Sequence, residues 1–266
     1  MVDACHPAPT AVVTIAVTLL AAAAGRDRPG LALMALATLT GQLSIGWCND
    51  AFDADRDRAA GRVEKPTVRG DVTATTLWRA AVLALAATVA TSYLAAGRIG
   101  GTAHVVAVGS AWAYDLLLKA TVLSWLPYVV SFGLVPAFVT YGLTPPTPPA
   151  WWLTGAAGLL GAGAHLANAI PDVESDEAVG AGGVVARIGV RRATWLTLAC
   201  LVGALTLLVV HVGLAPWVGA VLVLVAVAGA VATGVRGRPR TLFRYVMGLA
   251  VLCVVLLVAA TGTLTS

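Results

Sequence analysis

Long apolar runs limit what this chain can fold into more than any other feature of its sequence. Runs of about 18 or more apolar residues recur along its 266 residues, and each is long enough to cross a bilayer as a helix. Only 11% of the residues are charged, compared with about 25% in soluble globular domains. The sequence therefore predicts an all-α, polytopic membrane protein, with residues 1–266 forming a single domain.

Nine apolar segments are candidate transmembrane helices. Short stretches rich in glycine, proline or arginine separate them, among them Gly97-Arg98 and the proline-rich residues 145–149, and such stretches end helices. The nine segments cover roughly residues 10–24, 31–48, 74–96, 99–118, 122–143, 151–170, 193–213, 216–234 and 245–264.

Basic residues are distributed unevenly between the two sides of the membrane that this arrangement creates. Of the 17 Lys and Arg, 14 lie in or beside the loops that follow the second, fourth, sixth and eighth segments. The other three are Arg26, Arg28 and Arg98. Because cytoplasmic loops carry an excess of Lys and Arg, we expect the N-terminus inside and the C-terminus outside a bacterial-type cytoplasmic (inner) membrane. No long basic stretch is interleaved with aromatic residues, so no nucleic-acid partner is expected.

An acidic motif directly follows the second apolar segment and consists of Asn49, Asp50, Asp53 and Asp57. On a helix, residues four apart drift by only about 40° per step, so Asn49, Asp53 and Asp57 form a column with Asp50 beside it. Carboxylates packed this closely repel one another unless a divalent cation lies between them. Hard oxygen donors suit Mg²⁺, so these four residues are predicted metal ligands. The alternative is a solvated acidic helix end.

The motif returns as Asn168, Asp172 and Asp176, since 168−49, 172−53 and 176−57 are all 119. The same offset relates Gly70 to Gly189. An internal repeat of this length predicts two structurally similar halves. The second motif therefore indicates a second carboxylate column, and two facing columns can hold two Mg²⁺ ions around a diphosphate.

The repeat also predicts how the two halves are related. They cover roughly residues 10–118 and 122–234, with four helices each, and a ninth helix follows at 245–264. Four segments separate the two motif helices, an even number, so these helices run in the same direction and the repeat is parallel. Both columns are therefore expected at the cytoplasmic end of one central cavity.

Basic residues follow both motifs. Lys65 and Arg69 come after the first and are assigned to diphosphate binding, because cations beside metal-bound phosphates neutralise the remaining charge. Arg191 and Arg192 come just before a new apolar segment and are assigned to anchoring at lipid headgroups.

Together these features resemble the UbiA superfamily of intramembrane prenyltransferases. The first family motif, Asn-Asp-x-x-Asp-x-x-x-Asp, is matched by Asn49, Asp50, Asp53 and Asp57, and the second, Asp-x-x-x-Asp, by Asp172 and Asp176. The basic residue, proline and glycine that follow the first motif are matched by Lys65, Pro66 and Gly70. The tyrosine and lysine at the end of the fourth helix resemble Tyr114 and Lys119. The chain departs from the family at Arg69, where small residues are common, and at Asp71, where a basic residue is frequent.

The resemblance implies a helical bundle with a lateral opening to membrane lipid and two Mg²⁺ ions that bind an isoprenyl diphosphate. Metal ligation would fall to the four aspartates Asp53, Asp57, Asp172 and Asp176, with Asn49 and Asn168 as neutral donors. The diphosphate would be contacted by Lys65, Arg69, Lys119 and Asn168. Tyr114 would stabilise positive charge or orient a phosphate. The allylic carbon–oxygen bond ionises in a dry site, and an electron-rich acceptor captures the carbocation.

Prenyl transfer to a lipophilic acceptor is therefore the predicted function, with an aromatic quinone precursor as the first acceptor class and a lipid or polyol as others. Members of the family that use an aromatic carboxylate acceptor often have an arginine in or before the first segment. Here the first arginine is Arg26, after that segment, so the resemblance implies 4-hydroxybenzoate less than other acceptors. A membrane terpene cyclase shares the fold and the metal chemistry and is the main alternative. A cation or metabolite transporter is the other alternative, although acidic columns at one face beside basic loops suit a phosphate cage better.

Overall fold

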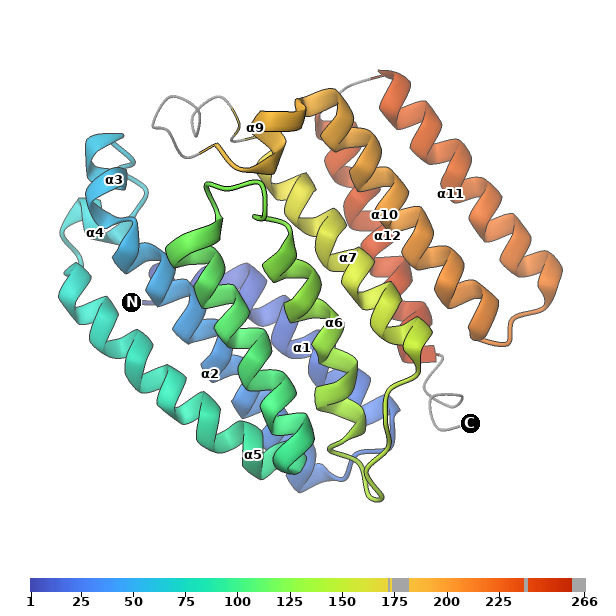
Figure 1. The fold of residues 1–266 in the computed structure, drawn as a ribbon, viewed down its shortest axis with the longest axis horizontal. Helices are drawn as coiled ribbons and strands as arrows, with labels where there is room; N and C mark the ends of the chain where they lie inside the picture. Colours follow the sequence, from blue (N-terminus) through green and yellow to red (C-terminus); the bar gives the residue numbers. More distant parts are fainter. Residues whose placement is uncertain (172, 174–181, 237–238, 260–266) are drawn as a thin grey trace. The chain divides into compact units, whose positions relative to one another are not determined.

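The computed structural model describes residues 1–171, 173, 182–236 and 239–259, and every regular element within these ranges is helical (Figure 1). The all-α prediction is confirmed. In chain order the helices are η1 (Asp3–Cys5), α1 (Pro7–Ala23), α2 (Arg28–Phe52), α3 (Ala54–Ala59), α4 (Pro66–Arg69), α5 (Ala74–Ala113), η2 (Tyr114–Leu118), α6 (Leu126–Thr140), α7 (Trp151–Ala169), α9 (Val184–Ile188), α10 (Val190–His211), α11 (Pro216–Arg236) and α12 (Pro239–Ala259).

Each apolar segment predicted from the sequence overlaps one of these helices. Within the described residues, four helical stretches are both long and apolar enough to cross a membrane: Arg28–Phe52, Ala74–Leu118, Val190–His211 and Pro216–Val235. The apolar helices Pro7–Ala23 and Leu126–Thr140 are shorter. The chain is an integral membrane protein with several apolar helices, while the number nine for those that span the bilayer stays a prediction.

The stretch Ala74–Leu118 is long enough for two crossings and is folded back on itself (Figure 1). The backbone leaves helical geometry at Ala96 and at Gly97, whose φ of 61° is readily adopted only by glycine. Residues on either side of this break are in contact, since Ser92 Oγ lies 2.7 Å from His104 Nδ1. The predicted break at Gly97 is therefore confirmed.

The chain divides into two compact units. The first contains Met1–Lys119 and Phe138–Thr147, and the second contains Ala120–Ala137 and the described residues from Pro148 onward. The short helices α4 and α9, one in each unit, end at glycines that are 119 residues apart. Gly70 and Gly189 both have positive φ, 81° and 82°, but their ψ angles differ, 9° and 150°, and the two repeat halves stay a prediction.

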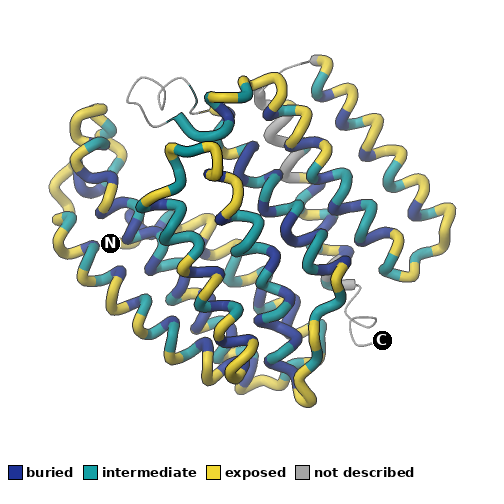
Figure 2. The backbone as a smooth tube through the Cα atoms, viewed as in Figure 1, coloured by how far each residue is buried: buried dark blue, intermediate teal, exposed yellow. Residues whose placement is uncertain are grey.

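The first unit is held together mainly by α2 packing against α5. Small residues let the two backbones approach, because Ala37 and Ala81 are fully buried and a Cβ added at Gly41 would lie 3.0 Å from Val108 Cγ2. Close packing through small residues is typical of helices in lipid, where apolar burial alone gives no driving force. Figure 2 shows the buried inner faces of these helices and the exposed outer face of α5.

The second unit has its core between α7 and α10. Leu153 and Ala156 of α7 and Leu201 and Leu205 of α10 are fully or almost fully buried. Large apolar side chains of α11, such as Leu224, are exposed, which is the pattern of a helix that faces lipid.

Candidate functional site

The backbone places the first acidic motif on almost continuous helix. Helix α2 ends at Phe52 and α3 begins at Ala54, and Asp53 between them keeps right-handed helical φ and ψ. The Asp53 amide donates to the Asn49 carbonyl (3.0 Å) and the Asp57 amide to the Asp53 carbonyl (2.8 Å). Because these are bonds of four-residue spacing, the predicted column of Asn49, Asp53 and Asp57 is confirmed for the backbone.

Burial separates the aspartates of this stretch into two kinds. Asp50, Asp53 and Asp57 are only 1%, 6% and 1% exposed, whereas the side chain of Asp55 is 97% exposed. A buried carboxylate is costly unless it is paired with a cation or hydrogen-bonded. The solvated helix end considered above therefore describes Asp55 and not the other three.

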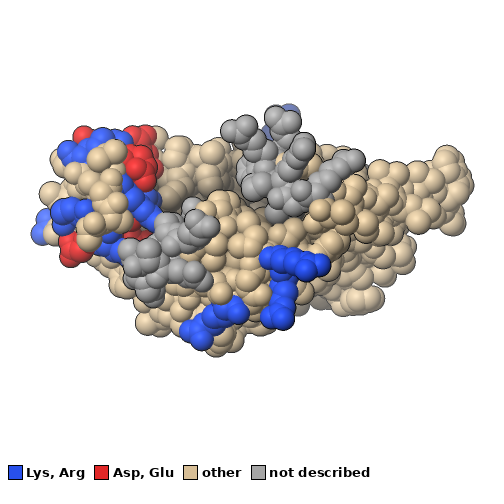
Figure 3. All heavy atoms as spheres, turned by 90° about the horizontal axis from the view of Figure 1, so that it is seen from above, with Lys and Arg blue, Asp and Glu red and all other residues tan. Residues whose placement is uncertain are grey.

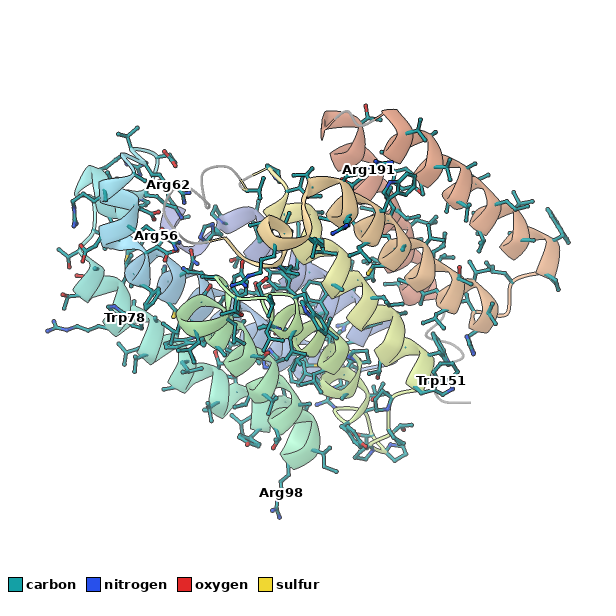
Figure 4. The ribbon with its side chains drawn as sticks, turned by 45° about the horizontal axis from the view of Figure 1, so that its top comes forward. Arg56, Arg62, Trp78, Arg98, Trp151 and Arg191 are labelled. Carbon is teal, nitrogen blue, oxygen red and sulfur yellow. The ribbon has the colours of Figure 1, made fainter. Side chains whose placement is uncertain are left out.

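Each buried aspartate is paired with a basic side chain. Lys65 Nζ donates to Asp50 Oδ1 at 2.6 Å, and Arg62 donates to Asp57 Oδ1 at 3.3 Å. Asp53 pairs with Lys119 and, at 2.8 Å, with Arg56. We call these four basic and three acidic residues the charge cluster. Figure 3 shows acidic and basic side chains gathered over the part of the first unit that contains α3 and α4, and Figure 4 shows Arg56 and Arg62 there.

The loop after α3 brings two of the basic residues back to the acids. The Arg62 amide donates to the Asp57 carbonyl at 3.0 Å, so the chain turns immediately after the column. Lys65 precedes α4 in extended conformation, and Pro66 occupies the first turn of that helix, where proline needs no hydrogen-bond partner for its nitrogen. Lys65 is thereby held beside Asp50.

Lys119 reaches the cluster from the other long helix of the first unit. It follows η2, a π-helical turn over Tyr114–Leu118, and its amide donates to the Tyr114 carbonyl at 3.0 Å. Its ammonium group lies 5.1 Å from the centroid of the Phe52 ring, in cation–π range. Single π-helical turns are rare and occur frequently at functional sites. Tyr114 itself is half-buried at the start of this turn.

Asp115 is a member of the site that the sequence analysis missed. It is buried, and Asn49 Nδ2 donates to its Oδ1 at 3.0 Å. The Asp115 carboxylate accepts this hydrogen bond, so the side-chain nitrogen of Asn49 faces Asp115. The side-chain oxygen of Asn49 is then the atom that could bind a metal. Arg56 and His6 were missed as well. An acid inside a predicted membrane segment was the available signal for Asp115.

The described residues fit part of a Mg²⁺ site. The Oδ2 atoms of Asp50, Asp57 and Asp115 are buried and have no hydrogen-bond partner in the described part of the chain. Burial raises the pKa of the Asp57 carboxyl above its usual range, because desolvation disfavours the charged form. No group of three His, Cys, Asp or Glu side chains among the described residues could hold a metal alone. The hard oxygen donors suit Mg²⁺, and the remaining ligands must come from elsewhere.

The structure does not bring Arg69 into the charge cluster. Arg69 is exposed, and it donates to Asp71 at 2.7 Å, to Asp3 at 3.0 Å and to the Glu64 carbonyl at 2.8 Å. Its assignment to diphosphate binding stays a prediction. In the second motif, Asn168 lies exposed near the end of α7, and Asp172 and Asp176 lie outside the described residues.

Comparison with known proteins identifies the fold and the family. The sequence matches the model of the UbiA prenyltransferase family over residues 11–247. None of the curated proteins matches it.

Three solved structures illustrate the likeness. A UbiA homologue from Archaeoglobus fulgidus bound to GPP and Mg²⁺ has a TM-score of 0.70 and 17% identity, with 98% of this chain and 99% of that chain covered. An apo UbiA homologue from Aeropyrum pernix K1 has a TM-score of 0.67 and 20% identity, with 91% of this chain and 94% of that chain covered. The structure of a digeranylgeranylglyceryl phosphate synthase has a TM-score of 0.72 and 15% identity, with 100% of this chain and 98% of that chain covered. At these identities the likeness establishes the fold.

Proposed function

Because the chain belongs to the UbiA prenyltransferase family, we propose that it catalyses Mg²⁺-dependent transfer of an isoprenyl group from its diphosphate to a lipophilic acceptor. Members of the family are prenyltransferases, and the chain is accordingly a membrane-embedded prenyltransferase. Divalent metal use is supported by homologues of this fold bound to Mg²⁺ together with GPP or DMAPP.

One observation carries the proposal: three buried carboxylates stand within two helical turns, and each is paired with a basic side chain. Lys65 comes from the loop that follows the motif. Lys119, 66 residues after Asp53 in the sequence, comes from the end of η2. A site that binds a metal–diphosphate complex needs both signs of charge, acids for the metal and cations for the phosphate oxygens. The charge cluster supplies both in one place.

We assign the metal ions to the two motifs, with Asn49, Asp50, Asp53 and Asp57 from the first and Asp172 and Asp176 from the second. Bound Mg²⁺ would supply positive charge to the leaving diphosphate. Lys65 and Lys119 would exchange their carboxylate partners for diphosphate oxygens, and Asn168 would contact the same group. Two ions are expected from the two motifs.

The catalytic step breaks the allylic carbon–oxygen bond, and its electron pair leaves with the diphosphate. The acceptor then forms a bond to the allylic carbon and loses a proton. Tyr114, whose ring comes from the turn that also supplies Lys119, is assigned to stabilising the carbocation through its π face. Apolar surroundings keep water from capturing the cation.

An aromatic quinone precursor is the first acceptor class that we propose. A lipid acceptor is the second, and the fold likeness to a digeranylgeranylglyceryl phosphate synthase supports testing it. Terpene cyclisation would use the same metal site without an external acceptor.

Diphosphate release with and without an acceptor separates these functions. Purified protein with geranylgeranyl diphosphate and Mg²⁺ should release little diphosphate alone. Adding a lipophilic extract of the source cell should speed release at least about tenfold and yield a product heavier by the acceptor's mass, since productive ionisation needs the acceptor in place. Fast release without extract, together with a cyclic hydrocarbon or terpene alcohol in mass spectrometry, would instead establish cyclisation.

We also propose that the charge cluster faces the cytoplasm, with the N-terminus inside and the C-terminus outside. The support is the concentration of Lys and Arg near the motifs, with Arg98 at the opposite end of the first unit (Figure 4). The loop after α6 lies at that opposite end as well. A Cβ added at Gly142 would be 3.3 Å from the carbonyl oxygen of Ala95, which precedes the break at Gly97.

Cysteine labelling tests this orientation. In a background without the four native cysteines, Val63→Cys and Pro146→Cys, both at exposed positions, should react from opposite sides of the membrane. Pro146→Cys should react with an impermeant maleimide from outside. Reaction of both variants from the same side would contradict the proposed orientation.

A further inference from the structure

The segment before α1 is docked onto the helix that carries the first acidic motif. Ala4 and Cys5 are buried, and Ala4 packs in one cluster with Ala51 and Leu77. The Cys5 backbone lies so close to Gly46 that a Cβ there would be 2.8 Å from Cys5 Cα, C and O. Such distances do not occur between real Cβ atoms and backbone, so only glycine permits this approach.

Three polar contacts anchor the same segment. Trp47 Nε1 donates to the Met1 carbonyl at 3.0 Å, and Arg69 donates to Asp3 at 3.0 Å. Thr10 Oγ1 of α1 also donates to the Cys5 carbonyl at 2.7 Å. We call residues 1–6 the N-terminal latch. Asp3 of the latch is thus one of three groups that accept from Arg69, beside Asp71 and the Glu64 carbonyl.

The last residue of the latch reaches the charge cluster. His6 has a left-handed backbone, with φ 52° and ψ 69°, and is the only non-glycine residue with positive φ among the described residues. This conformation joins η1 directly to α1. His6 Nε2 lies 3.3 Å from Asp50 Oδ1, the same oxygen that accepts from Lys65.

We propose that His6 is a positioning residue that holds Asp50 when Lys65 moves to the diphosphate. The inference rests on the proposed function, because it is the diphosphate that draws Lys65 away. Asp50 is buried, and Lys65 and His6 are the neighbours of its Oδ1 among the described residues. A buried carboxylate that loses its donor is costly and changes orientation. His6 would keep Oδ1 occupied and would leave Oδ2, which has no partner in the described part of the chain, available to a metal ion.

The proposal predicts a change in Mg²⁺ dependence when His6 is altered. In His6→Ala, the Mg²⁺ concentration for half-maximal diphosphate release should rise about tenfold, as is usual when the hydrogen-bond partner of a metal ligand is lost. The rate at saturating Mg²⁺ should change by less than about twofold. Thermal stabilisation of the purified protein by Mg²⁺ in the presence of inorganic pyrophosphate, which would draw Lys65 away without turnover, should shift to higher Mg²⁺ concentration in His6→Ala. With Mg²⁺ alone the shift should be smaller, because Lys65 then still donates to Asp50.

Two variants serve as controls for this experiment. His6→Gln, whose amide can donate to Asp50, should restore most of the Mg²⁺ dependence. Val2→Ala changes an exposed side chain of the latch and should behave as wild type. An unchanged Mg²⁺ dependence in His6→Ala, or an equal shift in His6→Gln or Val2→Ala, would overturn the proposal.

Gly46→Ala displaces the latch without changing His6. Alanine favours the helical conformation of α2, so the helix itself should stay intact while its new Cβ pushes the Cys5 backbone away. The Mg²⁺ dependence should shift as in His6→Ala, and the double variant should shift no further, because both changes break one interaction.

Labelling of Cys5 verifies that the latch has moved. With Cys48, Cys200 and Cys253 replaced by alanine, Cys5 should react with a maleimide faster in Gly46→Ala than in His6→Ala. Faster labelling with unchanged Mg²⁺ dependence would overturn the proposal. Failure of the proposed function is a different result: wild-type protein would then show no Mg²⁺-dependent release from an isoprenyl diphosphate, even with acceptor extract.

Discussion

Asp53→Ala is expected to lower the rate of diphosphate release by at least about 10³-fold, because a metal ligand contributes several kcal/mol to the transition state and about 4 kcal/mol corresponds to a thousandfold. Asp53 lies in the middle of the column and pairs with both Lys119 and Arg56. Nearby carboxylates cannot replace it, since Asp50 and Asp57 have basic partners of their own. The measurement is release of diphosphate from geranylgeranyl diphosphate at saturating Mg²⁺ with acceptor extract present.

Asp55→Ala is the matched control for this variant. Asp55 sits on the same helix two residues later, is exposed, and pairs only with Arg58 at 2.7 Å among the ion pairs of the described residues. Its loss should leave the rate within about twofold of wild type, since exposed ion pairs contribute little. Gel filtration in detergent should show that both variants remain folded. Near-wild-type release by folded Asp53→Ala would contradict the assignment of the first motif.

Asp172→Ala tests the second motif in the same assay. Asp172 corresponds to Asp53 at the offset of 119 residues, and it lies outside the described residues. A loss as large as that of Asp53→Ala is expected if both motifs hold metal ions in one site.

The parts of the site that follow from local spacing could be predicted from the sequence. Asn49, Asp53 and Asp57 are four residues apart, and a helix alone places them in a column. Lys65 lies in the loop that immediately follows, so its return to Asp50 needs only a tight turn. The break of the long apolar stretch at Gly97 was also predictable, because glycine beside arginine interrupts an apolar helix.

The parts that depend on contacts between distant segments could not be predicted. Asp115 meets Asn49 across 66 residues, and His6 reaches Asp50 from the segment before α1. The periodicity of a sequence does not show which residues of two distant helices will be in contact. The contact between Arg69 and Asp3 is of the same kind, since it joins residues 66 apart, while the role of Arg69 at the diphosphate stays a prediction.

Counting membrane crossings from the sequence has a physical limit of its own. The helices α1 and α6 have 17 and 15 residues, fewer than the about 20 that a perpendicular crossing needs. Short helices can cross where the bilayer thins locally or where neighbouring helices cover their ends. Length and hydropathy therefore support several spanning helices without determining that there are nine.

The central claim is that buried carboxylates hold the metal on which diphosphate release depends, and removal of the metal tests it most directly. Purified wild-type protein with geranylgeranyl diphosphate and acceptor extract should release diphosphate with Mg²⁺. Excess EDTA should reduce release by at least about 10³-fold, because the cationic side chains alone cannot replace divalent charge at the leaving group. Adding Mg²⁺ back should restore full release in wild type and none in Asp53→Ala at any Mg²⁺ concentration. Release that continues unchanged in EDTA, or that Mg²⁺ restores equally in both proteins, would contradict the account.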